Sequence, residues 1–238
     1  MVVLLLGSAP MASEAALWPR APFDRIVAIN NAWRVRADWD VSVFPWDFPA
    51  ERRPVAGPGQ HLVTEAEFVP AQNAFGGFVY AGATMAFTAA YWALHTLRPR
   101  VLAVFGCDMQ YPKSGPTHFY GRGSPDPLRA DITLRSLEAK SARLMVLAAM
   151  RGTAVVNLSS GPSRLILPHA ARPGLAQARP KAWCPDLAAE ALALEAELGY
   201  LVPSGRYWEE ADRFDPVALD RLDALWLQAA TIPLRQTG

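Results

Sequence analysis

The residues best suited to chemistry follow one apolar, β-branched run near the middle of the chain. Residues 101–105 end at Gly106, and Asp108, Tyr111 and His118 come soon after it. Histidine has a reference pKa of about 6.5, which suits a general base near neutral pH. We therefore predict that His118 is a catalytic base in a loop close to Tyr111 and Asp108. The alternative is a structural histidine that is hydrogen-bonded within its own loop.

Three other apolar runs also end in small or polar residues. In an open parallel sheet, ligands bind just beyond the carboxyl ends of the strands, so these endings are expected to meet at one edge. The endings are Gly7-Ser8-Ala9-Pro10 after residues 2–6, Asn30-Asn31 after residues 25–29, and Ser159-Ser160-Gly161-Pro162-Ser163 after residues 154–158.

Each of these endings contains groups that bind parts of a nucleotide. Between a strand and a helix, the N–H groups of residues 7–10 and the helix dipole can hold a phosphate. The amides of Asn30 and Asn31 can pair with a base, a ribose or a sugar carboxylate, and the hydroxyls of residues 159–163 with a phosphate or ribose. The structural alternatives are a tight turn with Ser8 as helix cap, ordinary asparagine turn residues, and a plain loop.

The sequence argues against dinucleotide cofactors and metal ions. The turn at Gly7 is not G-x-G-x-x-G, and the second strand ends in Asn30 instead of the acid that binds an NAD ribose. The D-x-D sequence Asp38-Trp39-Asp40 precedes a strand, away from the expected site, whereas Asp47 is better placed. There is no zinc-type Cys/His spacing and no G-x-S-x-G motif. We predict no cofactor and no metal.

The composition of the chain excludes several classes of protein. The chain has 238 residues, is 51% hydrophobic, and has a net charge of +1 with acids and bases interspersed, which does not suggest nucleic-acid binding. Its apolar runs are far shorter than the ~20 residues of a membrane span. Residues 1–16 lack the basic start and the longer apolar stretch of a signal peptide. With two cysteines and no disulfide framework, the chain is predicted to be cytoplasmic.

Strands alternate with helices, which predicts an α/β, Rossmann-like parallel sheet with helices on both faces. Residues 1–168 form the predicted nucleotide-binding domain. Residues 169–238 form a linker and a C-terminal helical appendage that packs on the core or on a partner. A homo-oligomer is therefore one possible assembly. Expected strands are 2–6, 25–29, 41–44, 101–105 and 154–158, with an edge strand near 61–63. Expected helices are 11–18, 82–97, 127–150, 185–199 and 215–230, and residues 49–60 are an expected loop.

In this order, the motifs resemble those of the bacterial sialyltransferases of glycosyltransferase family 42. The family's G-x-G-P-S turn corresponds to residues 7–11, with Ala9 and Met11 as differences, its Asn-Gln pair to Asn30-Asn31, and its Ser-Gly to Ala81-Gly82. Its Gly-x-Asp and following Tyr correspond to residues 106–108 and Tyr111, one position displaced, and its His-Tyr-x-Gly to residues 118–121. The resemblance covers roughly residues 1–168. The chain is also similar to a wider set of uncharacterised Rossmann-like proteins that share Asp-Met, here Asp108-Met109, followed by Thr-His, here Thr117-His118.

The resemblance implies a metal-independent, inverting enzyme that transfers a sugar from a CMP-sugar donor to a glycan or small-molecule acceptor. His118 would deprotonate the acceptor, Tyr111 would hydrogen-bond the departing phosphate, and Asn30, Gly7 and Ser8 would hold the nucleotide. The family's long lid between Tyr and His is reduced here to residues 112–117. Two alternatives stay open: a diphosphokinase-like phosphotransferase that uses Mg²⁺, and a nucleotide-binding module without catalysis.

Overall fold

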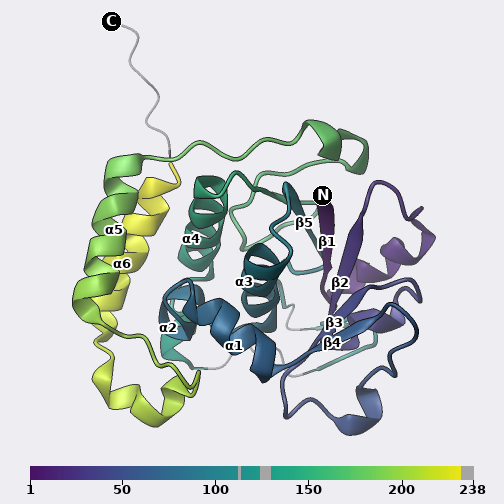
Figure 1. Cartoon of the computed structure of the whole chain (residues 1–238), viewed down its shortest axis with the longest axis horizontal. Coiled ribbons are helices and arrows are strands. Elements are labelled where there is room, and N and C mark those ends of the chain that lie inside the picture. Colours follow the sequence, from purple (N-terminus) through teal and green to yellow (C-terminus); the bar gives the residue numbers. More distant parts are fainter. Residues whose placement is uncertain (112–113, 124–129, 232–238) are drawn as a thin grey trace, which may run out of the picture.

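A six-stranded, all-parallel sheet forms the centre of the protein (Figure 1). The computed structural model describes residues 1–111, 114–123 and 130–231. The strand order β4-β3-β2-β1-β5-β6 confirms the predicted parallel sheet, including its edge strand at 61–63. The strands are β1 (Val2–Leu6), β2 (Arg25–Ile29), β3 (Val41–Val43), β4 (His61–Val63), β5 (Val101–Phe105) and β6 (Ala154–Asn157).

The central strands are continuous apolar runs because both faces of the sheet are covered. Every residue of β1 and of β5 is buried. Successive side chains of β1 alternate between two hydrophobic cores: Val3 and Leu5 belong to one core, and Leu4 and Leu6 to the other. A strand exposed to water on one face would instead alternate apolar and polar residues.

The two faces are covered by different kinds of helix. The first core lies under α1 (Glu65–Asn73), α3 (Met85–Thr96) and α4 (Leu137–Met150), which lie to the left of the strands in Figure 1. The second core lies under short 3-10 helices. These are η1 (Pro10–Leu17), η2 (Asn30–Arg34) and η6 (Arg172–Gln177). The expectation of helices on both faces is confirmed, with 3-10 turns on one of them.

Two elements of the first face differ from the sequence expectation. Helix α4 begins at Leu137 rather than near residue 127, because Ser136 caps it by accepting a hydrogen bond from the N–H of Ala139; residues 124–129 lie outside the described part. Helices α1 and α2 (Phe78–Ala81) occupy a stretch for which we predicted no helix. Pro70 lies inside α1, and an internal proline normally argues against a helix.

The C-terminal region packs onto the first core. Helix α6 (Pro216–Ala229) contacts both α4 and α5 (Pro185–Leu198), and its Leu222 and Trp226 are buried in the same cluster as the sheet residues. In Figure 1, α5 and α6 form the outer layer beside α4. The described part of the predicted appendage is therefore continuous with the core of the sheet.

The strand order reverses direction at β1 and β5, which creates a crevice beyond their carboxyl ends. The two chain turns there touch: the N–H of Gly7 donates to the carbonyl of Phe105 at 2.8 Å, and that of Ala9 to Gly106 at 2.9 Å. A Cβ atom on Gly7 would lie 2.3 Å from the Gly106 carbonyl oxygen. Only glycine permits this approach, so the sequence at the two turns determines the shape of the crevice.

Candidate functional site

A cavity of about 180 Å³ lies at this crevice, beyond the carboxyl ends of β1, β2 and β5. Five predicted site residues from four segments of the chain contribute to its wall, together with Tyr120, which we did not predict. The predicted residues are Gly7, Ser8, Asn30, Tyr111 and His118. The tertiary structure therefore brings together the predicted base His118, the tyrosine predicted to bind the departing phosphate, and part of the predicted nucleotide-binding residues.

The backbone is strained at two points of the wall. Asn30 has φ 50° and Met109 has φ 54°; in the described part of the chain, the one other non-glycine residue with positive φ is Arg98. Such conformations cost free energy and cluster at ligand sites. Among the residues that the structure describes, the buried Oδ1 atom of Asn30 has no hydrogen-bond partner. A buried amide oxygen without a partner is unusual, so Asn30 is suited to pair with a polar group of a ligand.

Helix α3 directs its N-terminus at the same cavity. Its cap residue Thr84 accepts a hydrogen bond from the N–H of Phe87 at 3.3 Å, and Thr84, Met85 and Ala86 all line the cavity. The first N–H groups of a helix and its dipole favour a negative charge. Together with the turn at Ser8, this helix end makes the cavity suitable for a phosphate group.

His118 is held at the cavity by a compact loop. The backbones of His118 and Gly121 exchange two hydrogen bonds, of 2.9 and 3.0 Å, and the N–H of Phe119 donates to the carbonyl of Ser8 at 3.0 Å. The imidazole stacks on Tyr120, with ring centroids 4.9 Å apart, and lies 6.2 Å from the ring of Tyr111. The loop therefore connects the histidine directly to the predicted phosphate-binding turn.

The surroundings of His118 favour a neutral imidazole that accepts a proton. Partial burial lowers its pKa below the usual value, so the ring is uncharged at neutral pH. Thr117 Oγ1 lies 2.9 Å from its Nδ1 and accepts a hydrogen bond from the N–H of Gly123 at 3.1 Å. In the tautomer whose Nδ1–H donates to Thr117, Nε2 carries the free electron pair that a base needs.

Asp108 and the predicted serines at 159–163 do not line the cavity. The carboxylate of Asp108 is buried and accepts hydrogen bonds from Asn157 Nδ2 at 3.1 Å and Ser159 Oγ at 2.8 Å. These bonds connect the end of β5 to the end of β6, and the three side chains are not part of the cavity wall. Ser160 is exposed, and Ser163 accepts a hydrogen bond from the N–H of Leu165.

The three other predicted residues lie near the cavity but outside its wall. Gly82 ends α2 with φ 87°, where a Cβ atom would lie 2.9 Å from Phe87. Pro10 is the exposed first residue of η1. Asn31 is buried in η2, and its Oδ1 atom also lacks a partner within the described part of the chain.

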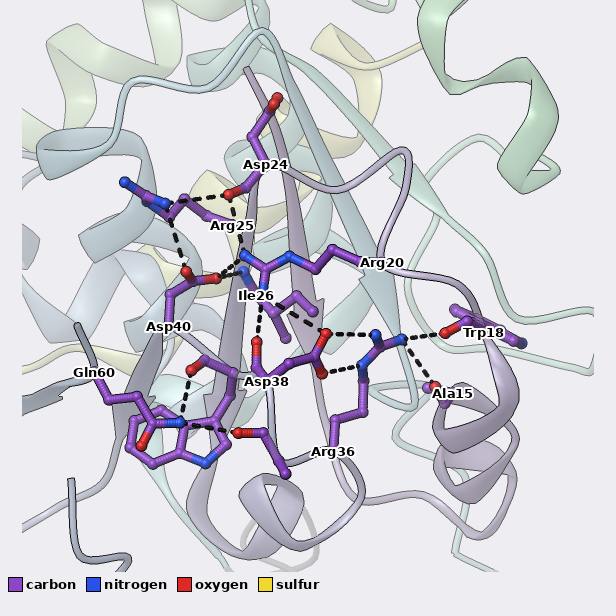
Figure 2. Close-up of polar contacts among 12 residues, drawn as sticks. Ala15, Trp18, Arg20, Asp24, Arg25, Ile26, Arg36, Asp38, Asp40 and Gln60 are labelled. Carbon is purple, nitrogen blue, oxygen red and sulfur yellow. Dashed lines mark hydrogen bonds and ion pairs between the residues drawn. The ribbon is translucent and has the colours of Figure 1, made fainter. Parts of the chain in front are cut away.

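The D-x-D sequence lies at the opposite edge of the sheet, at the start of β3, and its carboxylates are paired with arginines (Figure 2). Arg36 donates two 2.8 Å hydrogen bonds to Asp38 and holds the pKa of that carboxyl below its usual range. Asp40 forms an ion pair with Arg20 at 2.6 Å and accepts a hydrogen bond from the N–H of Ile26 at 2.7 Å. Through Asp40, these contacts connect the start of β3 to β2 and to the segment that follows η1. In the ranges that the structure describes, no group of three His, Cys, Asp or Glu residues is arranged to hold a metal.

A second cavity, of about 460 Å³, adjoins the first and includes Met85 in its wall, as the first does. Its other walls come from residues 45–47, α1, α2 and residues 204–208. Of the predictions, only Asp47 lies here. The exposed Trp46 and Trp208 are the signal that sequence reasoning missed, because nothing in their spacing shows that the fold brings them to one cavity.

No helix in the described ranges is both long and apolar enough to cross a bilayer. Comparisons of the chain with models of known protein families, with curated proteins and with solved structures found no match.

Proposed function

We propose that this protein is a sialyltransferase-like, metal-independent, inverting glycosyltransferase that uses a CMP-activated sugar as donor. One observation carries the proposal: a base-competent histidine, a tyrosine, an amide oxygen without a partner among the described residues and a helix N-terminus line a single cavity at the switch point of a parallel sheet. This combination provides an anion site beside a proton acceptor. Transfer of a sugar from a nucleotide phosphate to a hydroxyl needs both.

In the proposed reaction, Nε2 of His118 takes the proton of an acceptor hydroxyl. The acceptor oxygen then forms a bond to the anomeric carbon of the donor sugar from the side opposite the phosphate, and the bond between that carbon and the phosphate oxygen breaks. CMP leaves with the bonding electron pair. The N–H groups at the start of α3 and the hydroxyl of Tyr111 stabilise the charge that develops on its phosphate.

The Mg²⁺-dependent phosphotransferase is less well supported. It would need Asp47 and Asp108 as metal ligands, but both carboxylate oxygens of Asp108 already accept hydrogen bonds from Asn157 and Ser159. Asp47 lies in the wall of the second cavity.

Calorimetry with CMP in the presence of EDTA tests the proposed ligand class. We expect CMP to bind, and expect Asn30→Asp to weaken binding by about tenfold or more, since a carboxylate there repels the phosphate and loses the amide donor. Aspartate tolerates the left-handed backbone of Asn30, so the fold should survive. The matched control is Ser160→Asp, which adds the same charge at an exposed position outside the cavity and should leave CMP affinity unchanged.

Three other outcomes would contradict the proposal. If CMP does not bind and ATP binds only with Mg²⁺, the protein is instead the Mg²⁺-dependent phosphotransferase. If CMP binds but a CMP-sugar is neither transferred nor hydrolysed, the protein is a nucleotide-binding module. If Ser160→Asp weakens CMP binding as much as Asn30→Asp does, the nucleotide site lies elsewhere.

A further inference from the structure

The second cavity has the size of a ligand site and lies next to the proposed catalytic one. Its volume of about 460 Å³ falls within the range of about 300–1,000 Å³ that is usual for small-molecule sites, whereas the 180 Å³ of the first cavity is below it. Met85, at the start of α3, borders both cavities. A substrate that extends from His118 past Met85 would therefore enter the second cavity.

Two exposed tryptophans border this cavity. Trp46 is 69% exposed and Trp208 is 56% exposed, although tryptophan is mostly buried in folded proteins. An indole left in water at the rim of a cavity offers a flat apolar surface to a ligand. Trp46 follows β3 and Trp208 belongs to η7 (Tyr207–Arg213), so the two come from segments far apart in sequence.

Polar and charged side chains surround the aromatic surfaces. Asp47, Glu65, Ser204 and Arg206 also line the cavity. Glu65 accepts a hydrogen bond from the N–H of Trp46 at 2.6 Å, which fixes the backbone that carries this indole. A sugar ring has an apolar face of C–H groups and a rim of hydroxyls, so flat aromatic surfaces beside carboxylate and guanidinium groups match both of its parts.

The C-terminal region supplies one wall and is anchored firmly. Tyr207 stacks on Phe78 of α2, with centroids 6.3 Å apart, and its hydroxyl donates to Asp131 Oδ2 at 2.7 Å. A Cβ atom on Gly205, which has φ 77°, would lie 3.0 Å from Phe78. These contacts hold residues 204–208 against α1 and α2, so the wall is preformed.

We infer that the second cavity is the acceptor subsite and that Trp46 and Trp208 bind a sugar ring of the acceptor glycan by stacking. The inference rests on the proposed glycosyl transfer, because that reaction requires an acceptor beside His118. Because Met85 borders both cavities, an acceptor that extends from such a ring past Met85 would enter the cavity that His118 lines. The subsite also gives the C-terminal region a role in choosing the acceptor.

Sugar binding to full-length variants tests the subsite. The wild type, Trp46→Ala and Trp208→Ala are titrated with the methyl β-glycosides of galactose, glucose and N-acetylglucosamine and with N-acetylneuraminic acid. Binding is followed by saturation-transfer NMR and calorimetry, and CMP affinity is measured in parallel. We expect at least one sugar to bind the wild type, and each substitution to weaken it by about tenfold, equivalent to about 1.4 kcal/mol, with CMP affinity unchanged.

The matched control is Trp33→Ala, a partly buried tryptophan that packs against the second core, on the other face of the sheet. It should leave sugar binding unchanged. The inference is overturned if none of the four sugars binds, or if both cavity variants bind them as the wild type does. If sugars bind through the tryptophans but CMP does not bind, the sugar site stands and the proposed nucleotide-sugar chemistry fails, so the two failures are distinguishable.

Discussion

Replacing His118 with alanine is expected to lower the rate of glycosyl transfer by roughly 10²–10⁴-fold, the usual contribution of a general base. CMP affinity should change little, because a group that acts on the acceptor hydroxyl contributes little to holding the donor. The measurements are initial transfer rates at saturating CMP-sugar and calorimetry with CMP.

The pH dependence of the wild type gives a second readout of the same group. Because burial lowers the pKa of His118, transfer should be constant at neutral pH and above, and should fall on acidification with a midpoint below about 6.5, the reference value. Protonation there removes the electron pair on Nε2. In His118→Ala, the residual rate should lack this acidic decline.

The matched control is His95→Ala, an exposed histidine at the far end of α3. It should leave both the rate and the pH profile unchanged. If His118→Ala transfers sugar at the wild-type rate, the histidine serves only to hold its loop through Thr117 and Gly121.

The second large effect concerns stability. Glu195→Ala is expected to lower the free energy of unfolding by about 3–5 kcal/mol, because it leaves the buried Arg143 charge without its partner. The guanidinium of Arg143 donates two 2.7 Å hydrogen bonds to Glu195 and one of 2.9 Å to Tyr91. Burial opposes the charge, but Glu195 prevails and raises the pKa of Arg143. Trp226 Nε1 also donates to Glu195 at 2.8 Å.

Chemical denaturation measures this effect against two comparison variants. Glu197→Ala removes an exposed carboxylate from the same helix and should change stability by less than about 0.5 kcal/mol. The double variant Arg143→Met, Glu195→Leu removes both charges together and should be more stable than Glu195→Ala, since no unpaired charge stays buried. A loss below 1 kcal/mol for Glu195→Ala would show that water reaches and solvates Arg143.

Local sequence features predicted most of the sheet and the part of the site that lies on it. Runs such as residues 2–6 and 101–105 are apolar throughout because both faces of a parallel strand are buried. Strands of this kind can therefore be recognised from the sequence alone. Gly7, which follows residues 2–6, and Asn30, which follows residues 25–29, face the crevice because parallel strands place all their carboxyl ends at one edge. The positions of Gly7 and Asn30 at this edge were predictable for this reason.

The tertiary structure decided which of the polar residues at that edge face the cavity. Asp108 lies one turn of chain beyond β5, but its carboxylate pairs with Asn157 and Ser159 on the neighbouring strand, because buried charge requires hydrogen-bond donors and β6 supplies them. Nothing in the order of these residues along the chain distinguishes Asp108 from a ligand-binding group.

The second cavity depends wholly on contacts between distant segments. Trp46 follows β3, next to the edge strand β4, and Trp208 lies in the C-terminal region. They reach one cavity because α6 packs on α4 and Tyr207 packs on Phe78. The spacing of apolar residues in a sequence reveals the local strand or helix and its buried face, but not which distant segments contact each other. The sequence therefore determined the strands and the residues at their ends, whereas the docking of the C-terminal helices decided that two isolated tryptophans line one cavity.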